Sequence, residues 1–140
     1  MVGFCDRFFA NEWADYTSNN ETSCPINDFD EWLTTNAGST SPDTDYTAKC
    51  NGAIGVPMDP SSFDQCITGW AQSTNNTLVL SREGDVSIMY IRYQARVRFD
   101  SSYDELDKEW KAMEDYLENE RKTAPAGVNG MYHSSADFWW

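Results

Sequence analysis

The 140 residues fit a single domain, and 23 acidic against 10 basic side chains give the chain a net charge of −13. A field of this sign repels nucleic acids and anionic membrane surfaces, so both are unfavourable partners. The charge is uneven along the chain, because residues 1–64 hold 11 carboxylates against only Arg7 and Lys49.

Two short helices are predicted near the beginning of the chain. In "GFCDRFFANEWADY" the aromatic side chains recur at roughly helical spacing, and Cys5 pins the segment. These aromatic residues are Phe4, Phe8, Trp13 and Tyr16. After a polar turn, the run "DFDEWLTT", residues 28–35, is predicted to be a helix with Asn27 as its N-cap. Its aspartates stand in the first turn, where the helix dipole favours them.

Residues 36–57 are dense in Gly, Ser, Thr, Pro and Asn, which is typical of a loop, and Cys50 is expected to tether it. Asp43 and Asp45 are of a residue type that binds calcium, but the glycine and the distal glutamate of an EF-hand loop are missing. The sequence therefore predicts neither a calcium site nor any other cofactor.

Clear start signals follow for a third helix. Asp59 is the expected N-cap and Pro60 the first helical residue. An apolar stripe then runs along one face of the helix and consists of Phe63, Cys66, Ile67 and Trp70. The helix is expected to end in the exposed segment around Asn75.

The second half of the chain has the most regular pattern. Residues 86–99, "VSIMYIRYQARVRF", alternate between apolar and polar side chains and predict one long strand. Ser101 or Ser102 is then expected to cap an amphipathic helix that runs to Lys122 and stops before Pro125. A last strand from Val128 would lie beside the first, giving a strand-helix-strand unit.

The four cysteines include no CxxC pair, and the chain has a single histidine, so disulfides are favoured over a zinc site. Three pairings of the cysteines are possible. The preferred one joins Cys5 to Cys24 and Cys50 to Cys66. Two sequons, which predict glycosylation at Asn20 and Asn75, fit the same oxidising, secretory-side location.

The N-terminal run "MVGFCDRFFANEW" lacks the basic and apolar regions of a signal peptide. No stretch approaches the ~20 apolar residues that a membrane-spanning helix needs. Our interpretation is that the segment comes from a longer protein, as a loop between membrane spans, or from a secreted protein without its leader.

Two groups of residues are candidates for chemistry. His133 lies near serines and an aspartate in "HSSAD", but neighbouring residues of a strand point to opposite faces and no G-x-S-x-G motif is present, so an ordinary surface histidine is favoured over a hydrolase. Arg92, Arg96 and Arg98 form a polar row that an anionic ligand could use. Pairing with carboxylates of the same chain or of another subunit is favoured for them.

The order of elements resembles a known family. The runs "PSSFDQCITGWAQSTNN", "VSIMYIRYQARVRFDSSYDELDKEWKAMEDYLENER" and "GVNGMYHSSADFWW" carry the resemblance, which covers roughly residues 57–140. They are similar to the second extracytosolic domain of Patched, Dispatched and the Niemann-Pick type C sterol transporters, of the resistance-nodulation-division superfamily.

The resemblance implies an α+β fold, a ferredoxin-like strand-helix-strand porter subdomain at residues 58–140. Residues 1–57 would be a helical, disulfide-bonded insertion within one compact domain. The family's transport chemistry resides in membrane helices, and none of its catalytic or ion-coupling residues can be assigned here.

The resulting hypothesis is a non-enzymatic extracellular or lumenal domain of a membrane transporter or receptor. Its expected partners are the rest of the parent protein and a lipid, a sterol or a lipid-modified protein. Phe138, Trp139 and Trp140 would lie at the membrane interface, where aromatic rings are favoured. The alternative is a stand-alone secreted, disulfide-stabilised binding protein, and an acidic secreted hydrolase has little support.

Overall fold

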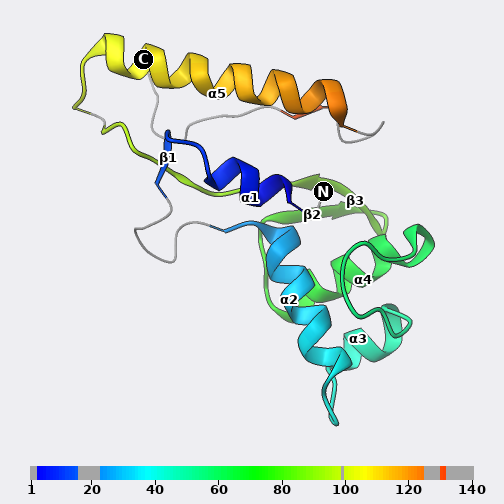
Figure 1. The fold of residues 1–140 in the computed structure, drawn as a ribbon. Helices are drawn as coiled ribbons and strands as arrows, with labels where there is room; N and C mark the ends of the chain where they lie inside the picture. Colours follow the sequence, from blue (N-terminus) through cyan, green and yellow to red (C-terminus); the bar gives the residue numbers. More distant parts are fainter. Residues whose placement is uncertain (1–2, 16–22, 99, 125–129, 132–140) are drawn as a thin grey trace. The chain divides into compact units, whose positions relative to one another are not determined.

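The computed structural model describes residues 3–15, 23–98, 100–124 and 130–131 (Figure 1). The chain divides into two compact units, residues 1–94 and residues 95–140. The boundary expected at residues 57/58 lies inside the first unit. The structure is of the mixed α+β class, as predicted, and its described residues form two two-stranded sheets, β1–β4 and the antiparallel β2–β3, and two disulfides.

The elements follow one another in chain order. The first unit contains α1 (Phe4–Phe9), β1 (Ala14–Asp15), α2 (Pro25–Ala37), α3 (Thr44–Lys49), α4 (Pro60–Ser73), β2 (Val79–Arg82) and β3 (Asp85–Met89). Strand β4 (Gln94–Ala95) falls at the boundary between the units, and the second unit contains α5 (Tyr103–Thr123).

Helix α4 is the central element of the first unit and contacts α2, α3, β2 and β3. It begins as predicted, because the Asp59 carboxylate accepts a hydrogen bond from the backbone N–H of Ser61 at 3.0 Å and Pro60 occupies the first turn. Three residues of the predicted stripe, Cys66, Ile67 and Trp70, are buried. The apolar face of this helix is therefore the middle of the core.

Both preferred disulfides are present, Cys5–Cys24 and Cys50–Cys66. All four cysteines are buried, none more than 4% exposed, and they belong to the same apolar cluster as the buried side chains of α2 and α4. Cys24 is the N-cap of α2 and Cys50 the C-cap of α3, so each bridge fixes one end of a helix.

Helix α1 is shorter than the predicted amphipathic segment and ends at Phe9. The Asn11 side chain donates hydrogen bonds to the carbonyls of Arg7 and Phe8, which closes the last turn of the helix. Trp13 then packs edge-on against Phe8, with ring centroids 4.8 Å apart. The predicted helix thus covers only the first part of the segment, and the turn after Phe9 brings these two rings together.

The predicted start of α2 is wrong. The N-cap is Cys24, followed by Pro25, and the helix therefore begins three residues before the expected 28–35. Proline is favoured in a first turn because its N–H is not needed there. Asn27 lies inside the helix, and its Nδ2 donates to Asp6 Oδ1 at 3.3 Å instead of capping.

The loop predicted at residues 36–57 contains a helix, α3. Its N-cap Asp43 accepts a hydrogen bond from the backbone N–H of Asp45 at 2.7 Å. Aspartate, serine and threonine are favoured both in loops and at helix N-caps, so composition alone did not reveal this helix. The predicted tether at Cys50 is confirmed.

The single long strand predicted at residues 86–99 is also wrong. Strand β3 pairs with β2 in an antiparallel hairpin that matches Val79 with Met89 and Leu80 with Ile88. The pairing ends just past this register, with a hydrogen bond of 2.7 Å from the Tyr90 N–H to the Leu78 carbonyl. The chain instead forms an isolated bridge in which Ser23 and Arg92 exchange backbone hydrogen bonds of 2.9 and 3.0 Å.

In the second unit, α5 begins as predicted. Ser102 and Glu105 form a capping box, in which each side chain bonds to the backbone of the other residue. The hydrogen bonds from Ser102 lower the pKa of the Glu105 carboxyl. The helix ends at Thr123. The strand expected from Val128 lies almost wholly outside the described residues, so the ferredoxin-like arrangement stays a prediction.

Candidate functional site

An open groove of about 410 Å³ lies between α2 and the C-terminal end of α4. Helix α2 contributes residues that share one face because they are three or four positions apart. Trp70 of α4, with Thr74 and Asn76 just after the end of that helix, forms the opposite wall. The lining consists of Asp28, Glu31, Trp32, Thr35, Trp70, Thr74 and Asn76. We name this site the α2–α4 groove.

Packed indoles form the apolar part of the α2–α4 groove. Trp32 is half-buried, stacks on Phe29 with ring centroids 6.1 Å apart, and meets Tyr46 edge-on at 5.7 Å. Trp70 is buried and packs against the same Phe29 at 5.5 Å. Trp32 is thus held from two sides by core residues, while part of its surface remains in the groove.

The C-terminal end of α4, which forms one wall of the groove, is closed by a Schellman capping motif. The backbone N–H of Asn75 donates to the carbonyl of Gln72, and that of Asn76 donates to the carbonyl of Ala71. With Asn75 in the left-handed conformation, φ 54°, this is a Schellman motif. Asparagine tolerates that conformation better than most residues, so Asn75 has a structural role apart from its sequon.

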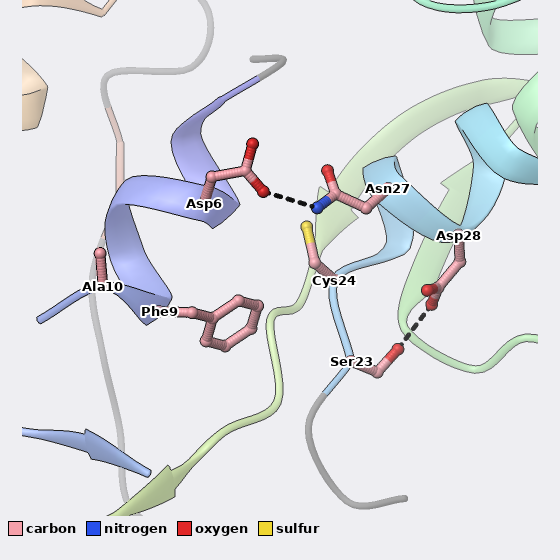
Figure 2. Close-up of a pocket in the computed structure, with 7 residues that line it drawn as sticks. All are labelled: Asp6, Phe9, Ala10, Ser23, Cys24, Asn27 and Asp28. Atoms are coloured by element: carbon pink, nitrogen blue, oxygen red, sulfur yellow. Dashed lines mark hydrogen bonds between the residues drawn. The ribbon is translucent and has the colours of Figure 1, made fainter. Parts of the chain in front are cut away.

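A second open groove of about 380 Å³ lies between α1 and the start of α2 (Figure 2). Its lining consists of Asp6, Phe9, Ala10, Ser23, Cys24, Asn27 and Asp28. The polar groups pair with one another, because Asn27 donates to Asp6 and Ser23 Oγ donates to Asp28 Oδ2 at 2.7 Å. Asp28 lines both grooves, but its bond to Ser23 holds it on this side.

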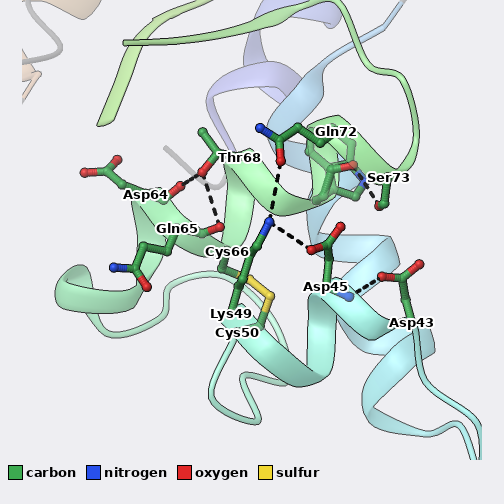
Figure 3. A network of polar contacts seen from close by, with 11 residues as sticks. Asp43, Asp45, Lys49, Cys50, Asp64, Gln65, Cys66, Thr68, Gln72 and Ser73 are labelled. Carbon is green, nitrogen blue, oxygen red and sulfur yellow. Dashed lines mark hydrogen bonds and ion pairs between the residues drawn. A yellow bond between two sulfur atoms is a disulfide. The ribbon is translucent and has the colours of Figure 1, made fainter. Parts of the chain in front are cut away.

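A polar network joins α3 to α4 beside the Cys50–Cys66 disulfide (Figure 3). Lys49 Nζ lies 2.8 Å from Asp45 Oδ1 and 3.5 Å from Gln72 Oε1. A Cβ atom at Gly69 would come within 2.6 Å of the Lys49 side chain, so the glycine allows this close approach. The network holds two helices together, and its ion pair is satisfied without a ligand.

Tyr93 lies in an aromatic cluster with Phe8 and Trp13, at centroid distances of 5.0 and 5.7 Å. Burial in this cluster raises the pKa of the Tyr93 hydroxyl to about 12, because the charged phenolate would lose its hydration. The side chain therefore stays neutral over the physiological range and serves packing.

The structure describes only some of the predicted site residues. Asn75 is exposed, as a glycosylation acceptor must be, whereas Asn20 lies outside the described residues. His133 and the terminal Phe138, Trp139 and Trp140 also lie outside them.

The three arginines of the predicted row are all exposed. Arg98 Nε pairs with Asp100, only two residues further along the chain, at 3.2 Å, so pairing of the row with carboxylates of other elements stays a prediction. Both partners are largely exposed, so the pair contributes little stability.

Sequence reasoning missed the α2–α4 groove. The spacing of Asp28, Glu31, Trp32 and Thr35 does place them on one helical face, which is a signal that could have been used. Nothing in the sequence showed that the end of α4 would face them, because that contact is tertiary.

Among the described residues, no three His, Cys, Asp or Glu side chains cluster as a metal site would require. No helix in this part of the chain is both long and apolar enough to span a bilayer. The chain matches no protein-family model and no curated protein sequence.

Proposed function

We propose that the chain is a non-catalytic extracytosolic domain of a membrane transporter or receptor that handles a lipid, a sterol or a lipid-modified ligand. The observation that supports an extracellular or lumenal environment is the pair of disulfides inside the core of the first unit. Such bonds persist in oxidising compartments and are rare in the cytosol. The role in transport rests on the family resemblance of residues 57–140.

In this proposal the domain acts through contacts and not through a reaction. Its partners are the remainder of the parent membrane protein and the transported molecule. Exposed aromatic side chains of the described residues, among them Tyr90 and Tyr103, are proposed to line an apolar path. Phe138, Trp139 and Trp140 are proposed to reach the membrane interface.

A stand-alone secreted binding protein is the second candidate. One observation favours it, which is the exposed apolar side of the β2–β3 hairpin. Leu80 and Ile88 are cross-strand partners, 45% and 40% exposed, and Tyr90 two residues further on is 42% exposed. An apolar surface of this kind is often used to bind a protein partner.

The reading frame of the parent transcript separates the two candidates. A frame that continues past the codon for Trp140 into ~20 apolar codons supports the transporter. A stop codon directly after Trp140 would reject the transporter and leave the secreted protein.

The redox assignment has its own test. The mass of the chain secreted from cultured cells, measured before and after reduction, should rise by about the mass of four hydrogen atoms, since reduction adds two hydrogen atoms to each disulfide. Four free thiols in the secreted chain would contradict the extracytosolic location.

A further inference from the structure

We propose that the α2–α4 groove binds a small organic cation, an alkylated ammonium ion of the choline type. This inference goes beyond the proposed function and does not depend on it. Three independent features of the groove lead to it: the charge of its lining, the helix end that closes it and the indole in its floor.

The lining of the groove carries two carboxylates and no basic side chain. Glu31 is exposed and has no ion pair or hydrogen bond to any described residue, so its charge is available to a ligand. Asp28 also lines the groove, but its bond to Ser23 Oγ holds its carboxylate on the side of the α1–α2 groove, so Glu31 is the acidic group that a ligand would meet. A cation is therefore the complementary ligand.

The C-terminal end of α4 adds to the same negative potential. Aligned peptide dipoles give a helix C-terminus a partial negative charge, which a lysine or arginine in the last turn commonly offsets. The last turn of α4 contains no basic residue of its own, and Lys49 of α3, which reaches Gln72, is ion-paired with Asp45. The Trp70 carbonyl accepts hydrogen bonds from Ser73 Oγ and Thr74 Oγ1, at 3.1 and 2.7 Å, and both donors are neutral.

The indole of Trp32 determines which kind of cation fits. An aromatic face attracts a cation within about 6 Å, and it favours weakly hydrated organic ions such as quaternary ammonium groups. The contacts of Trp32 with Phe29 and Tyr46 fix the ring before any ligand arrives. The groove is open to solvent, so a ligand in it stays partly hydrated, and a small head group is the kind of ligand it suits.

The test uses the oxidised full chain and the soluble probes tetramethylammonium and choline. Titration is followed by the NMR signals of the tryptophan side-chain N–H groups, with sodium chloride at equal ionic strength as the blank. We expect saturable shifts with a Kd on the order of millimolar, as for a single partly solvated cation–π contact. Absence of a saturable shift, or the same shift with sodium, would overturn the proposal.

Two variants locate the site. Thr35→Lys places a cation on the exposed rim of the groove and should abolish binding, whereas Ala37→Lys, an exposed position on the same helix outside the lining, should leave it intact. Glu31→Gln should weaken binding about two- to five-fold, as expected for one exposed charge. Glu12→Gln is the matched control at a distant exposed carboxylate. Equal binding by Thr35→Lys and the parent chain would reject this groove as the site.

Vesicles of phosphatidylcholine distinguish the source of the ammonium group. Saturable binding of soluble choline, with or without vesicle binding, supports the proposal. Binding to vesicles without any binding of soluble choline would reject it and indicate a membrane surface. None of these results bears on the reading-frame test, so the two proposals fail separately.

Discussion

The side-chain oxygen of Asn36 accepts a hydrogen bond of 2.6 Å from the backbone N–H of Asp43. The same amide donates through Nδ2 to the carbonyl of Trp32 at 2.9 Å, and Asn36 is only 9% exposed. One buried amide therefore links the last turns of α2 to the N-cap of α3. This contact explains why α3 starts where it does.

Replacing Asn36 by Ala should destabilise the first unit by about 1–3 kcal/mol, because the Asp43 N–H loses its acceptor in a partly buried place. Urea denaturation of the oxidised chain measures the change. Ser41→Ala, at an exposed neighbouring position, is the control and should have no comparable effect. Equal stability of Asn36→Ala and the parent chain would show that this hydrogen bond does not hold α3 in place.

Each disulfide should contribute about 3 kcal/mol, since the loops they close span 19 and 16 residues. Chains with Cys5 and Cys24, or Cys50 and Cys66, changed to Ala in pairs should lose similar stability, measured as the fall in Tm. A single Cys→Ala change is a poorer test, because the remaining thiol becomes reactive. A loss confined to one pair would show that the other bridge closes a segment already ordered without it.

The β2–β3 turn contains a position that is strained for its residue. Glu83 has φ 57° and Gly84 has φ 96°, which matches a type I′ hairpin turn, where Asn-Gly is the favoured pair. Glu83→Asn should raise the free energy of unfolding by up to about 1 kcal/mol, because asparagine tolerates the left-handed conformation better. Glu83→Gln removes the charge but not the strain, and an equal gain in that variant would contradict the conformational explanation.

The raised pKa of Tyr93 predicts a fall in stability at high pH. A tyrosine in the unfolded chain loses its proton near pH 10, while Tyr93 in the folded chain keeps its proton up to about pH 12. Unfolding therefore releases a proton in this window, and the free energy of unfolding declines as pH rises through it. Below the unfolded pKa the Tyr93 hydroxyl is protonated in both the folded and the unfolded chain, so it adds no pH dependence to the free energy of unfolding there.

Tyr93→Phe retains the ring but has no hydroxyl to ionise. Urea denaturation across this pH window should show a shallower decline for Tyr93→Phe than for the parent chain. Tyr103→Phe, at a position 74% exposed, is the control and should retain the parent slope. A parent-like slope for Tyr93→Phe would show that another group causes the decline.

Local signals in the sequence predicted the starts of α4 and α5 correctly. Asp59 with Pro60, and Ser102 with Glu105, act on neighbouring backbone groups, so their effect is visible without tertiary structure. The preferred cysteine pairing was also confirmed. The extent of β3 was not predictable in this way, since alternation of side chains does not show where the partner strand stops.

The candidate site was less accessible to sequence reasoning than the helices. Glu31 and Trp32 belong to a face that helical spacing can reveal, but only the contact between α2 and α4 turns that face into a groove. Asn75 shows a different difficulty. The same residue begins a sequon and closes a Schellman motif, and sequence alone does not separate the two roles.

Burial of the two disulfides limits how fast they can be reduced. A thiolate must reach a sulfur atom to attack it, and no cysteine of the bridges is more than 4% exposed. Reduction of the native chain must therefore wait for a local opening. The time course of Cys5–Cys24 reduction would report how often α1 separates from α2, and that of Cys50–Cys66 how often α3 separates from α4.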